Sequence, residues 1–567
     1  MNRAWLFLLL LILTAACQQA EQADVVFTNG KIYTVNSDQP WVEALAVKDE
    51  RIVAIGTADE VAAWQGDGTE VVDLQGAFAM PGFIEGHGHF LGLGESLMNL
   101  NFLRSRSWQE IIDAVAAEVQ QKKPGEWITG RGWHQEKWQE IVENTVLGYP
   151  YHHELSAVSP DNPVILRHAS GHGSFANAKA MEIAGVSRET PNPSGGEIVR
   201  DSRGEVIGMF EETAQRLITR AYSEYLDSLS EDEREERWMR AVTLAEEECL
   251  KNGITSFQDA GTALEDILKL RDLAEKGELD VRLWAMIRNS SEFLQDKLDG
   301  FPIINAGNHY FTSRAMKVSI DGALGPFGAW LLESYADKPN FVGQNTTPVP
   351  EVENLAKLAM AHGMQFCAHA IGDRANREVL DIFERNFKEN SDKKDLRWRI
   401  EHAQHLHPDD IPRFGQLGVI ASMQGIHCTS DAPFVEKRLG YERAVEGAYV
   451  WRSLLETGAV VTNGTDAPVE EVNPFESLYA TVTRKRSDTG FEFFPDQKLT
   501  REEGIYSYTM ACAYSAFEEK DKGSLELGKL ADMVVLSKDL LACTDEEILD
   551  TEVLMTIVGG NIKYAKE

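Results

Sequence analysis

Cysteine is scarce in this sequence, and its placement excludes two kinds of architecture. Only 6 of the 567 residues are cysteines, and no two of them form a Cys-x-x-Cys pair. A disulfide scaffold needs a denser set of cysteines, and a thiolate zinc site needs closely spaced pairs. We therefore expect most of them to be small buried apolar side chains, namely Cys249, Cys367, Cys428, Cys512 and Cys543.

Basic residues are also few for a chain of this length. There are 55 lysines and arginines against 90 aspartates and glutamates, which gives a formal net charge of -35. A nucleic-acid partner is excluded because a polyanion would be repelled. Hydrophobic residues make up 43% and charged residues 26%, as in ordinary globular proteins, so the simplest interpretation of the acidity is a solvated surface.

Long apolar runs are absent after the first residues. The run from Trp5 to Leu13 follows Arg3 and is too short to cross a bilayer as a mature helix, so it predicts an export signal. The stretch Leu13-Thr14-Ala15-Ala16-Cys17 resembles the lipobox of bacterial lipoproteins, with its leucine one place earlier than usual. The leader therefore predicts either a cell-envelope lipoprotein anchored at Cys17 or a plainly secreted protein, with residues 18–23 as a polar tether.

Short strand patterns gather at both ends of the chain. Residues 24–82 hold several alternating segments, and Asn29-Gly30 and Asp49-Glu50 are typical of hairpin turns between them. Similar segments return before the end of residues 481–567, after the last helices. We expect the two ends to build one β-sandwich; the alternative is two separate β units, which would leave more exposed edges.

The middle of the chain alternates between helical stretches and apolar strand-like runs, which predicts a parallel sheet and an α/β fold. So many repeats favour a (β/α)8 barrel over residues 83–480. The segment near residues 97–228 is longer than one βα unit requires, so we expect an inserted subdomain there. The strand-like runs are Val164 to Leu166, Ile254 to Phe257, Val281 to Ile287, Ala315 to Ile320, Gln365 to Ala368, Arg397 to Ile400, Val419 to Met423 and Val460 to Thr462.

Two histidines, His87 and His89, follow the Pro81-Gly82 turn at the start of this middle region. In an extended strand, residues two apart point to the same face, so both imidazoles can aim at one point. Two neutral imidazoles that converge in this way make half of a transition-metal site. A His-x-His pair on a surface strand is also common by chance, so this motif alone does not decide the matter.

Four more polar residues stand on or directly after predicted strands, where the chemistry of such barrels takes place. They are Lys317, His369, His402 and Asp466. Each alone has a simpler explanation, as a hydrogen-bonded loop residue or, for Lys317, as an edge-strand lysine that faces water. A lysine within a buried strand is costly unless it is neutralised or paired. Four such residues in a chain with only 14 histidines are harder to dismiss.

The order of these residues along the chain resembles that in the amidohydrolase superfamily. The short motifs around them are more similar still to those of its amidohydrolase-3 (YtcJ-like) branch. The similarity covers nearly all of the chain after the leader. One departure is Glu85-Gly86, where the family usually has aspartate and a small or polar residue. The matching stretches are Pro81-Gly82-Phe83-Ile84, His87-Gly88-His89, Lys317 to Gly322, His369 to Ala375, Arg399 to Gln404, Gly464 to Pro468 and Gly523 to Leu536.

The resemblance implies one or two divalent metal ions. His87, His89 and Asp466 would bind the more buried one, and His369 and His402 the second. Lys317 would bridge the two as a carbamate; if it is unmodified, a single metal is favoured. Zinc is the default for imidazole and carboxylate ligands, with manganese, iron and nickel as alternatives.

The resemblance also implies roles beyond the metal ligands. Asp466 would take a proton from the attacking water and deliver it to the leaving amine. His172, Arg131 and Trp133 would contact the substrate, although a loop histidine and aromatic packing explain them equally simply. Glu401 would orient a ligand or serve as a structural charge.

The sequence thus predicts an exported, metal-dependent amidohydrolase that cleaves a non-peptide C–N bond in a small molecule. The amide, N-acyl and N-formyl groups are the expected targets. One alternative is a cyclic-amide hydrolase of the same superfamily. Another is a non-catalytic substrate-binding lipoprotein on the same fold. Membrane contact would come only through the lipid anchor. The sequence does not decide between a monomer and a homodimer.

Overall fold

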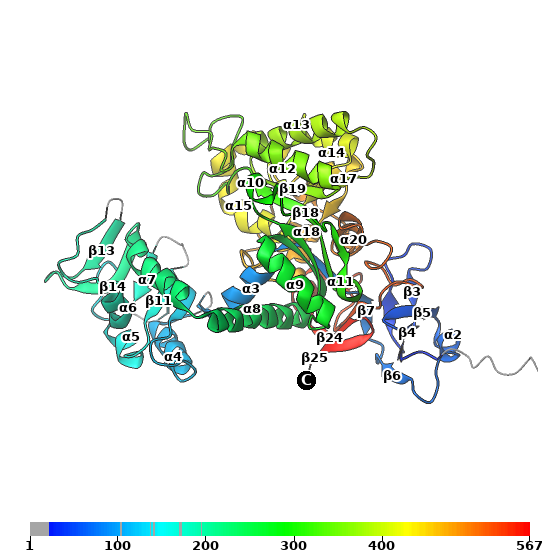
Figure 1. The fold of residues 1–567 in the computed structure, drawn as a ribbon, viewed down its shortest axis with the longest axis horizontal. Coiled ribbons are helices and arrows are strands. Elements are labelled where there is room, and N and C mark those ends of the chain that lie inside the picture. Colours follow the sequence, from blue (N-terminus) through cyan, green and yellow to red (C-terminus); the bar gives the residue numbers. More distant parts are fainter. Residues whose placement is uncertain are drawn as a thin grey trace, which may run out of the picture. The chain divides into compact units, whose positions relative to one another are not determined.

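The computed structural model describes residues 22–102, 105–135, 138–139, 142–168, 173–193 and 196–566. The chain forms two compact units (Figure 1). The first comprises the residues up to 90 and from 246 onward, and the second comprises residues 91–245. Helices α3 (Phe90–Leu97) and α8 (Glu231–Lys251) carry the chain from one unit into the other.

The first unit contains a sheet of eight parallel strands, which confirms the predicted (β/α)8 barrel. In spatial order the strands are β22 (Val461–Thr462), β21 (Ile420–Ser422), β20 (Arg399–His402), β19 (Gln365–Ala370), β18 (Phe311–Ser319), β16 (Arg282–Ile287), β15 (Ile254–Thr262) and β8 (Phe83–Gly88). The barrel closes where the loop after β22 meets β8. There the Asp466 N–H donates to the His87 carbonyl at 2.8 Å, and the His89 N–H donates to the Ala467 carbonyl at 2.7 Å.

Helices follow most barrel strands and cover the outer surface of the sheet (Figure 1). A short strand, β17 (Ile303–Asn305), pairs with β18 antiparallel. The helices of this unit from α9 onward are α9 (Leu264–Lys276), α10 (Ser291–Leu294), α11 (Ala306–His309), α12 (Val349–His362), α13 (Asp373–Glu389), α14 (Ile411–Leu417), α15 (Gly425–Leu439), α16 (Tyr441–Gly447), α17 (Trp451–Glu456), α18 (Pro474–Thr483), η2 (Pro495–Gln497), α19 (Arg501–Ser507), α20 (Met510–Ser515) and α21 (Asp545–Leu549).

Both chain ends build the β-sandwich beside the barrel, as predicted. One sheet is N-terminal and has the order β5 (Arg51–Gly56), β4 (Ala44–Lys48), β1 (Val25–Thr28) and β6 (Glu70–Asp73), with α2 (Ala58–Ala62) nearby. The other joins the two ends in the order β25 (Asn561–Ala565), β24 (Val553–Val558), β23 (Met533–Leu536), β7 (Phe78–Pro81), β2 (Lys31–Tyr33) and β3 (Trp41–Val42).

One turn prediction in this region is wrong. The strands on either side of Asn29-Gly30, β1 and β2, belong to different sheets and do not form a hairpin. Phe27 and Ile32 both lie in the sandwich core, so the chain crosses from one sheet to the other at this turn. The Asp49-Glu50 turn does join β4 and β5 as an antiparallel pair, and both of its residues have positive φ.

The second unit is a mixed sheet packed against short helices. The sheet order is β13 (Gly196–Arg200), β14 (Val206–Glu212), β12 (Gly173–Ala176), β11 (Val164–His168), β10 (Ile128–Trp133) and β9 (Leu100–Asn101). Besides parts of α3 and α8, it contains α4 (Trp108–Val119), α5 (His153–Val158), α6 (Ala178–Ile183) and α7 (Gln215–Ser228). Buried aromatic and aliphatic side chains give this unit a core of its own, so its sheet does not depend on the barrel for apolar cover.

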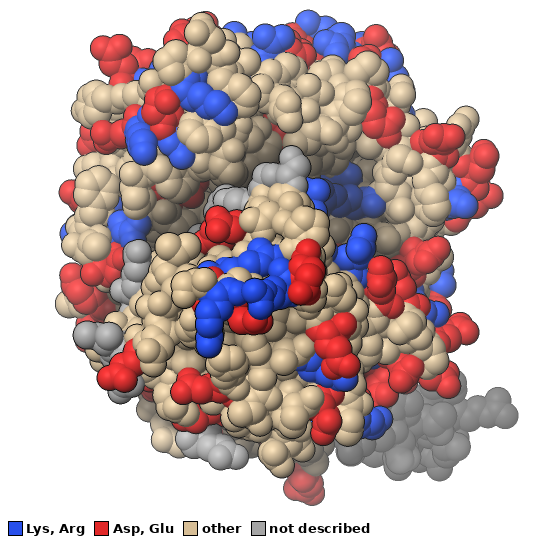
Figure 2. Space-filling model, turned by 90° about the vertical axis from the view of Figure 1, so that its left-hand side faces the viewer, with Lys and Arg blue, Asp and Glu red and all other residues tan. Residues whose placement is uncertain are grey.

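Charged side chains of both signs are spread over the face of the molecule shown in Figure 2. On this face the acidic excess is scattered and does not gather in one patch, as expected for a solvated surface. Among the residues that the structure describes, no helix is both long enough and apolar enough to span a membrane.

Candidate metal centre

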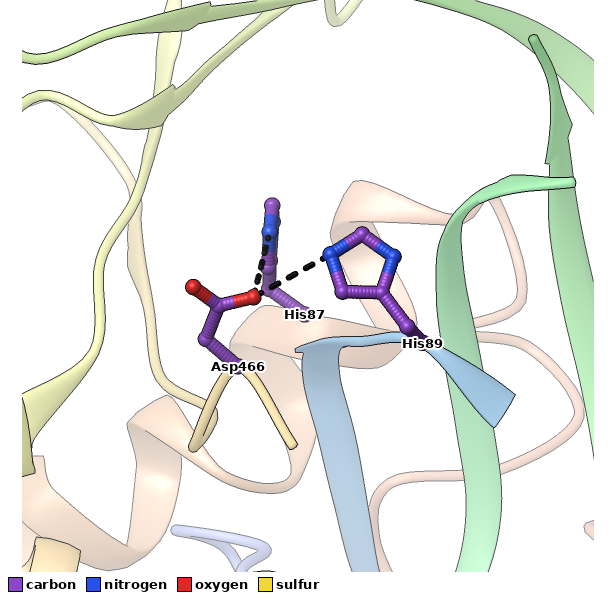
Figure 3. A group of neighbouring side chains, drawn as sticks. All are labelled: His87, His89 and Asp466. Carbon is purple, nitrogen blue, oxygen red and sulfur yellow. Dashed lines mark ion pairs between the residues drawn. The ribbon is translucent and has the colours of Figure 1, made fainter. Parts of the chain in front are cut away.

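Two histidines, one within β8 and one directly after it, approach one carboxylate at the C-terminal end of the barrel (Figure 3). His87 Nε2 lies 3.5 Å from Asp466 Oδ1, and His89 Nε2 lies 3.3 Å from the same oxygen. His87 is fully buried, and the side chain of His89 is 29% exposed. The two residues therefore converge on a point that a substrate can reach from one side.

The converging atoms lack ordinary partners. His87 Nε2 and Asp466 Oδ1 are buried and make no hydrogen bond within the described residues. A buried polar atom without a partner costs about 1–3 kcal/mol, so such atoms at one point call for a missing ligand. Imidazole nitrogens and a carboxylate oxygen are the donor set of a divalent transition metal. The site thus fits a metal ion held by His87, His89 and Asp466.

The position of Asp466 depends on a buried contact between β8 and the loop after β22. The Glu85 carboxylate accepts hydrogen bonds from the Thr465 N–H at 2.6 Å and from the Thr465 hydroxyl at 3.2 Å. A Cβ at Gly464 would lie 2.5 Å from Glu85 Oε1 and 2.7 Å from the His87 nitrogen, so only glycine allows this approach. Glu85, at which the sequence departs from the family pattern, therefore fixes the loop that carries Asp466.

A second group of possible ligands shares Asp466. His402, His427 and Asp466 place one donor atom each within 4.8 Å of one another. His427 Nε2 lies 3.3 Å from Asp466 Oδ2, on α15 just after β21. His402 Nδ1 is 2.8 Å from Gln424 Oε1, which leaves His402 Nε2 as its donor to a metal.

His427 was given no role by the sequence reasoning. Its position shortly after the predicted strand Val419 to Met423 was the one signal in the sequence that could have marked it. The α-helical start at Gly425 turns it back toward the barrel axis, and helix geometry of this kind is not visible in a strand pattern. Gln424, which holds His402, could have been found from the same strand end.

His369 and Lys317 reach the same region from β19 and β18. The His369 and His402 rings lie 4.4 Å apart between centroids, and His87 and His402 lie 4.6 Å apart. His369 Nε2 is buried, has no hydrogen bond within the described residues, and stands 3.6 Å from Asp321 Oδ1. Lys317 is 3% exposed and its Nζ donates to the Ala260 carbonyl at 3.1 Å.

A buried charge network orients His87. Its Nδ1 lies 2.5 Å from Glu401 Oε2, and Arg399 donates to both oxygens of that carboxylate at 2.7 and 3.0 Å. Arg399 also donates to the Gly86 carbonyl on β8 at 2.8 Å and to the Ser422 hydroxyl on β21 at 2.6 Å. The carboxylate fixes the tautomer of His87 so that Nε2 is the free donor, which assigns Glu401 its orienting role.

Two of the candidate ligands have a positive φ, a backbone conformation that residues other than glycine rarely adopt. The φ of His402 is 74° and the φ of Asp466 is 59°. Left-handed φ at a non-glycine residue costs free energy, about 1–3 kcal/mol, and persists where the surroundings hold it in place. Such strain at the ends of two barrel strands is typical of a functional site.

The electrostatics keep the ligands in metal-binding protonation states. Burial raises the pKa of Asp466, but the nearby imidazoles of His427, His87 and His89 outweigh it and hold that pKa well below its usual value. Burial lowers the pKa of His369 to about 3, with Lys317 adding to the effect, and burial also lowers the pKa of His402. Asp466 is therefore ionised and these imidazoles are neutral at neutral pH.

The pKa of His427 shifts in the opposite direction. Burial opposes its charge, but its hydrogen bonds to Asp466 and Glu470 raise the pKa of His427 to about 10. The protonated ring supplies positive charge beside Asp466. A divalent ion at Asp466 would repel that proton, so His427 would have to lose it to act as a ligand.

The three predicted substrate contacts belong to the segment between β8 and β15. His172 falls outside the described residues. Arg131 and Trp133 lie on β10 of the second unit. Trp133 is fully buried and its indole N–H donates to the Leu166 carbonyl at 2.9 Å, which gives it a packing role within that unit.

The sequence and the fold that carry this site are similar to those of known proteins. The model of a family described as the amidohydrolase family matches residues 70–564. The chain belongs to the amidohydrolase family. This amidohydrolase is 30% identical to YtcJ of Bacillus subtilis over 558 residues, which cover 95% of this chain and 99% of that protein.

Two further relatives connect this amidohydrolase with hydrolysis. It is 27% identical to N-substituted formamide deformylase of Arthrobacter pascens, over 96% of this chain and 99% of that protein. It also matches the crystal structure of an uncharacterized metal-dependent hydrolase from Pyrococcus horikoshii with a TM-score of 0.73 and 27% identity. That match covers 92% of this chain and 99% of the other. The amidohydrolase is therefore a hydrolase, and its histidine and aspartate cluster fits a divalent metal.

Proposed function

We propose that this amidohydrolase cleaves a non-peptide C–N bond in a small molecule that carries an amide, N-acyl or N-formyl group. The observation that carries the proposal is the pair of buried, unpartnered atoms His87 Nε2 and Asp466 Oδ1 at the mouth of the barrel. The deformylase relative, whose name specifies an N-substituted formamide, supports a C–N bond as the target. A site that only bound its ligand would not need an ionised carboxylate strained into this position.

Asp466 is the proposed catalytic base. Bound metal supplies the polarisation of the substrate carbonyl and the acidity of the attacking water. The ionised Asp466 carboxylate accepts the proton of that water and then donates it to the departing amine nitrogen. Glu401 and Gln424 hold the His87 and His402 rings in place during this transfer.

We propose one or two divalent ions, with zinc as the default, and a carbamate on Lys317 when two are present. Burial lowers the pKa of Lys317, and the neutral amine is the form that reacts with CO2. That reaction joins the amine nitrogen to the CO2 carbon and releases one proton. The product is an anionic two-oxygen ligand, which would replace a costly buried amine by a partner for the metals.

The test is metal content and turnover measured together on protein that lacks the leader. We expect about one or two equivalents of a transition metal and hydrolysis of N-acyl or N-formyl amines, both lost on chelation and restored by zinc. The substitution His427→Ala separates the two clusters: metal content should fall while the His87 and His89 ion stays. A chain that takes up no metal when supplied with it would contradict the proposal and favour a binding protein.

We also propose that the mature protein is exported and lipid-anchored at Cys17, on the sequence of the leader alone. Labelled palmitate should be incorporated into the full-length protein made in a bacterium that processes lipoproteins, and the protein should sediment with membranes. The substitution Cys17→Ser should abolish both without changing the turnover of the released protein. Unlabelled wild-type protein in the soluble fraction would point to plain secretion instead.

A further inference from the structure

One arginine stands at the mouth of the barrel next to the metal centre. Arg288 directly follows β16, whose last residue, Ile287, pairs with Met316 on β18 and with Thr262 on β15. Arg288 is therefore level with Lys317 on one neighbouring strand. It lies at the C-terminal end of the barrel, where the candidate metal ligands are.

The stem of Arg288 is packed beside Lys317 at a position that requires glycine. A Cβ on Gly261, whose φ is 132°, would lie 2.9 Å from Arg288 Cδ and 3.2 Å from Lys317 Cγ. The two long side chains thus flank the same glycine on β15. The Arg288 N–H also donates to the Thr262 carbonyl at 2.9 Å, which fixes the start of the side chain.

The guanidinium is directed toward the side of the site formed by His369. Its terminal nitrogen donates to the Ser319 hydroxyl at 3.2 Å, and Ser319 is the residue of β18 that pairs with His369 on β19. Arg288 is an exposed residue, and a single hydroxyl leaves most of its five N–H donors available.

This arginine makes no ion pair with any described carboxylate, in a chain with 90 acidic residues. Other arginines of this unit do have one, such as Arg377 with Asp410 and Arg413 with Asp381. An arginine that reaches a metal site without a carboxylate of its own is suited to bind one from a ligand, because its planar fork matches a carboxylate.

We propose that Arg288 determines substrate specificity by binding a carboxylate of the substrate, so that the preferred substrates are N-acylated amino acids or similar acidic amides. The inference rests on the proposed function for the chemistry at the metal centre, but the recognition of charge is separate from it. The substrate carbonyl would lie at Asp466, and the carboxylate on the side of the site formed by β16 and β18.

Matched pairs of compounds that differ only in the carboxylate test this inference. N-acetylphenylalanine, in both enantiomers, is compared with N-acetyl-2-phenylethylamine, and the N-formyl pair is treated in the same way. We expect the metal-loaded protein to prefer the acids by about 10- to 100-fold in kcat/KM, the range of a charge-assisted hydrogen-bonded pair. Arg288→Met should remove this preference mainly through KM, and Arg288→Lys should keep part of it.

A binding measurement makes the result independent of turnover. Calorimetric titration with N-tosylphenylalanine, which carries no cleavable amide, should give affinity that Arg288→Met weakens by at least about tenfold. Its decarboxylated analogue should bind both proteins equally. Arg271→Met is the matched control, because that α9 arginine is ion-paired with Asp272 and lies on a barrel helix.

The outcomes separate the two proposals. Binding that prefers the acid through Arg288, without turnover of any pair, would overturn the proposed function and support the charge specificity. Turnover without an acid preference, or a preference unchanged in Arg288→Met, would overturn the specificity. An equal loss for acid and neutral compounds together with a loss of metal would also overturn it, because Arg288 would then support the Lys317 ligand.

Discussion

Asp466→Asn should lower kcat/KM by about a thousandfold, because the amide side chain cannot accept the proton of the attacking water. Loss of a positioned acid–base group typically costs about 10²–10⁴-fold, or roughly 3–5 kcal/mol in transition-state stabilisation. The low pKa of Asp466 means that the wild-type carboxylate is available as a base throughout the neutral range. The measurement is kcat/KM of the metal-loaded variant with its metal content determined in the same sample.

Metal content decides how this result is interpreted. Asparagine keeps one oxygen donor, so we expect the His87 and His89 ion to be retained, although more weakly. The control is Asp532→Asn, which removes a buried carboxylate that pairs with Arg282 at 2.9 Å in the first unit, outside the metal cluster. That variant should lower the free energy of unfolding while its turnover per folded molecule stays the same. A fully active Asp466→Asn protein would remove Asp466 from its role as base.

Lys317→Ala should lose most of the activity and, if two metals are bound, about one equivalent of metal. The side chain is nearly fully buried and, among the described residues, its amine hydrogen-bonds only to the Ala260 carbonyl, so its removal leaves a cavity beside the candidate ligands. Short carboxylic acids such as acetate or propionate should enter this cavity and restore part of the turnover, because they replace the lost two-oxygen ligand. Activity is measured against acid concentration, with metal content at each point.

The rescue distinguishes a ligand from a structural lysine. Lys522 is also buried, pairs with Glu518 at 2.8 Å and donates to the Ser256 hydroxyl at 2.7 Å. Lys522→Ala should lower stability, keep its metal and show no response to carboxylic acids. If Lys317→Ala is fully active, Lys317 does not belong to the site. If it is inactive but keeps all its metal and cannot be rescued, a single-metal site with a structural lysine is favoured.

The barrel was predictable because its strands are buried on both faces and therefore appear in the sequence as short, continuous apolar runs. Val281 to Ile287 and Gln365 to Ala368 are examples, and both coincide with barrel strands. The crossing between sheets at Asn29-Gly30 was not predictable, because this pair of residues suits a hairpin turn and a connection between two sheets equally well. Only the tertiary partners of Phe27 and Ile32 distinguish these cases.

The candidate site was predictable where strand geometry alone aims the side chain. His87 and His89 converge because they are two residues apart at the end of β8, and Asp466 meets them because the last barrel strand closes on the first. His427 was missed because a helical turn, rather than a strand end, brings its ring to Asp466. The sequence left Glu401 between an orienting and a structural role, because its contact with His87 joins two strands far apart in the chain.

The pairing of β7 with β23 has a consequence for biosynthesis. β7 leads directly into β8, which contains His87 and is followed at once by His89, and its Met80 pairs with Val534 of β23, far along the chain. The ribosome therefore synthesises the first candidate metal ligands long before β23, the strand that pairs with β7 beneath them. A nascent chain that has not reached β23 leaves this edge of β7 unpaired, so the support of the metal centre is complete only after β23 has been made.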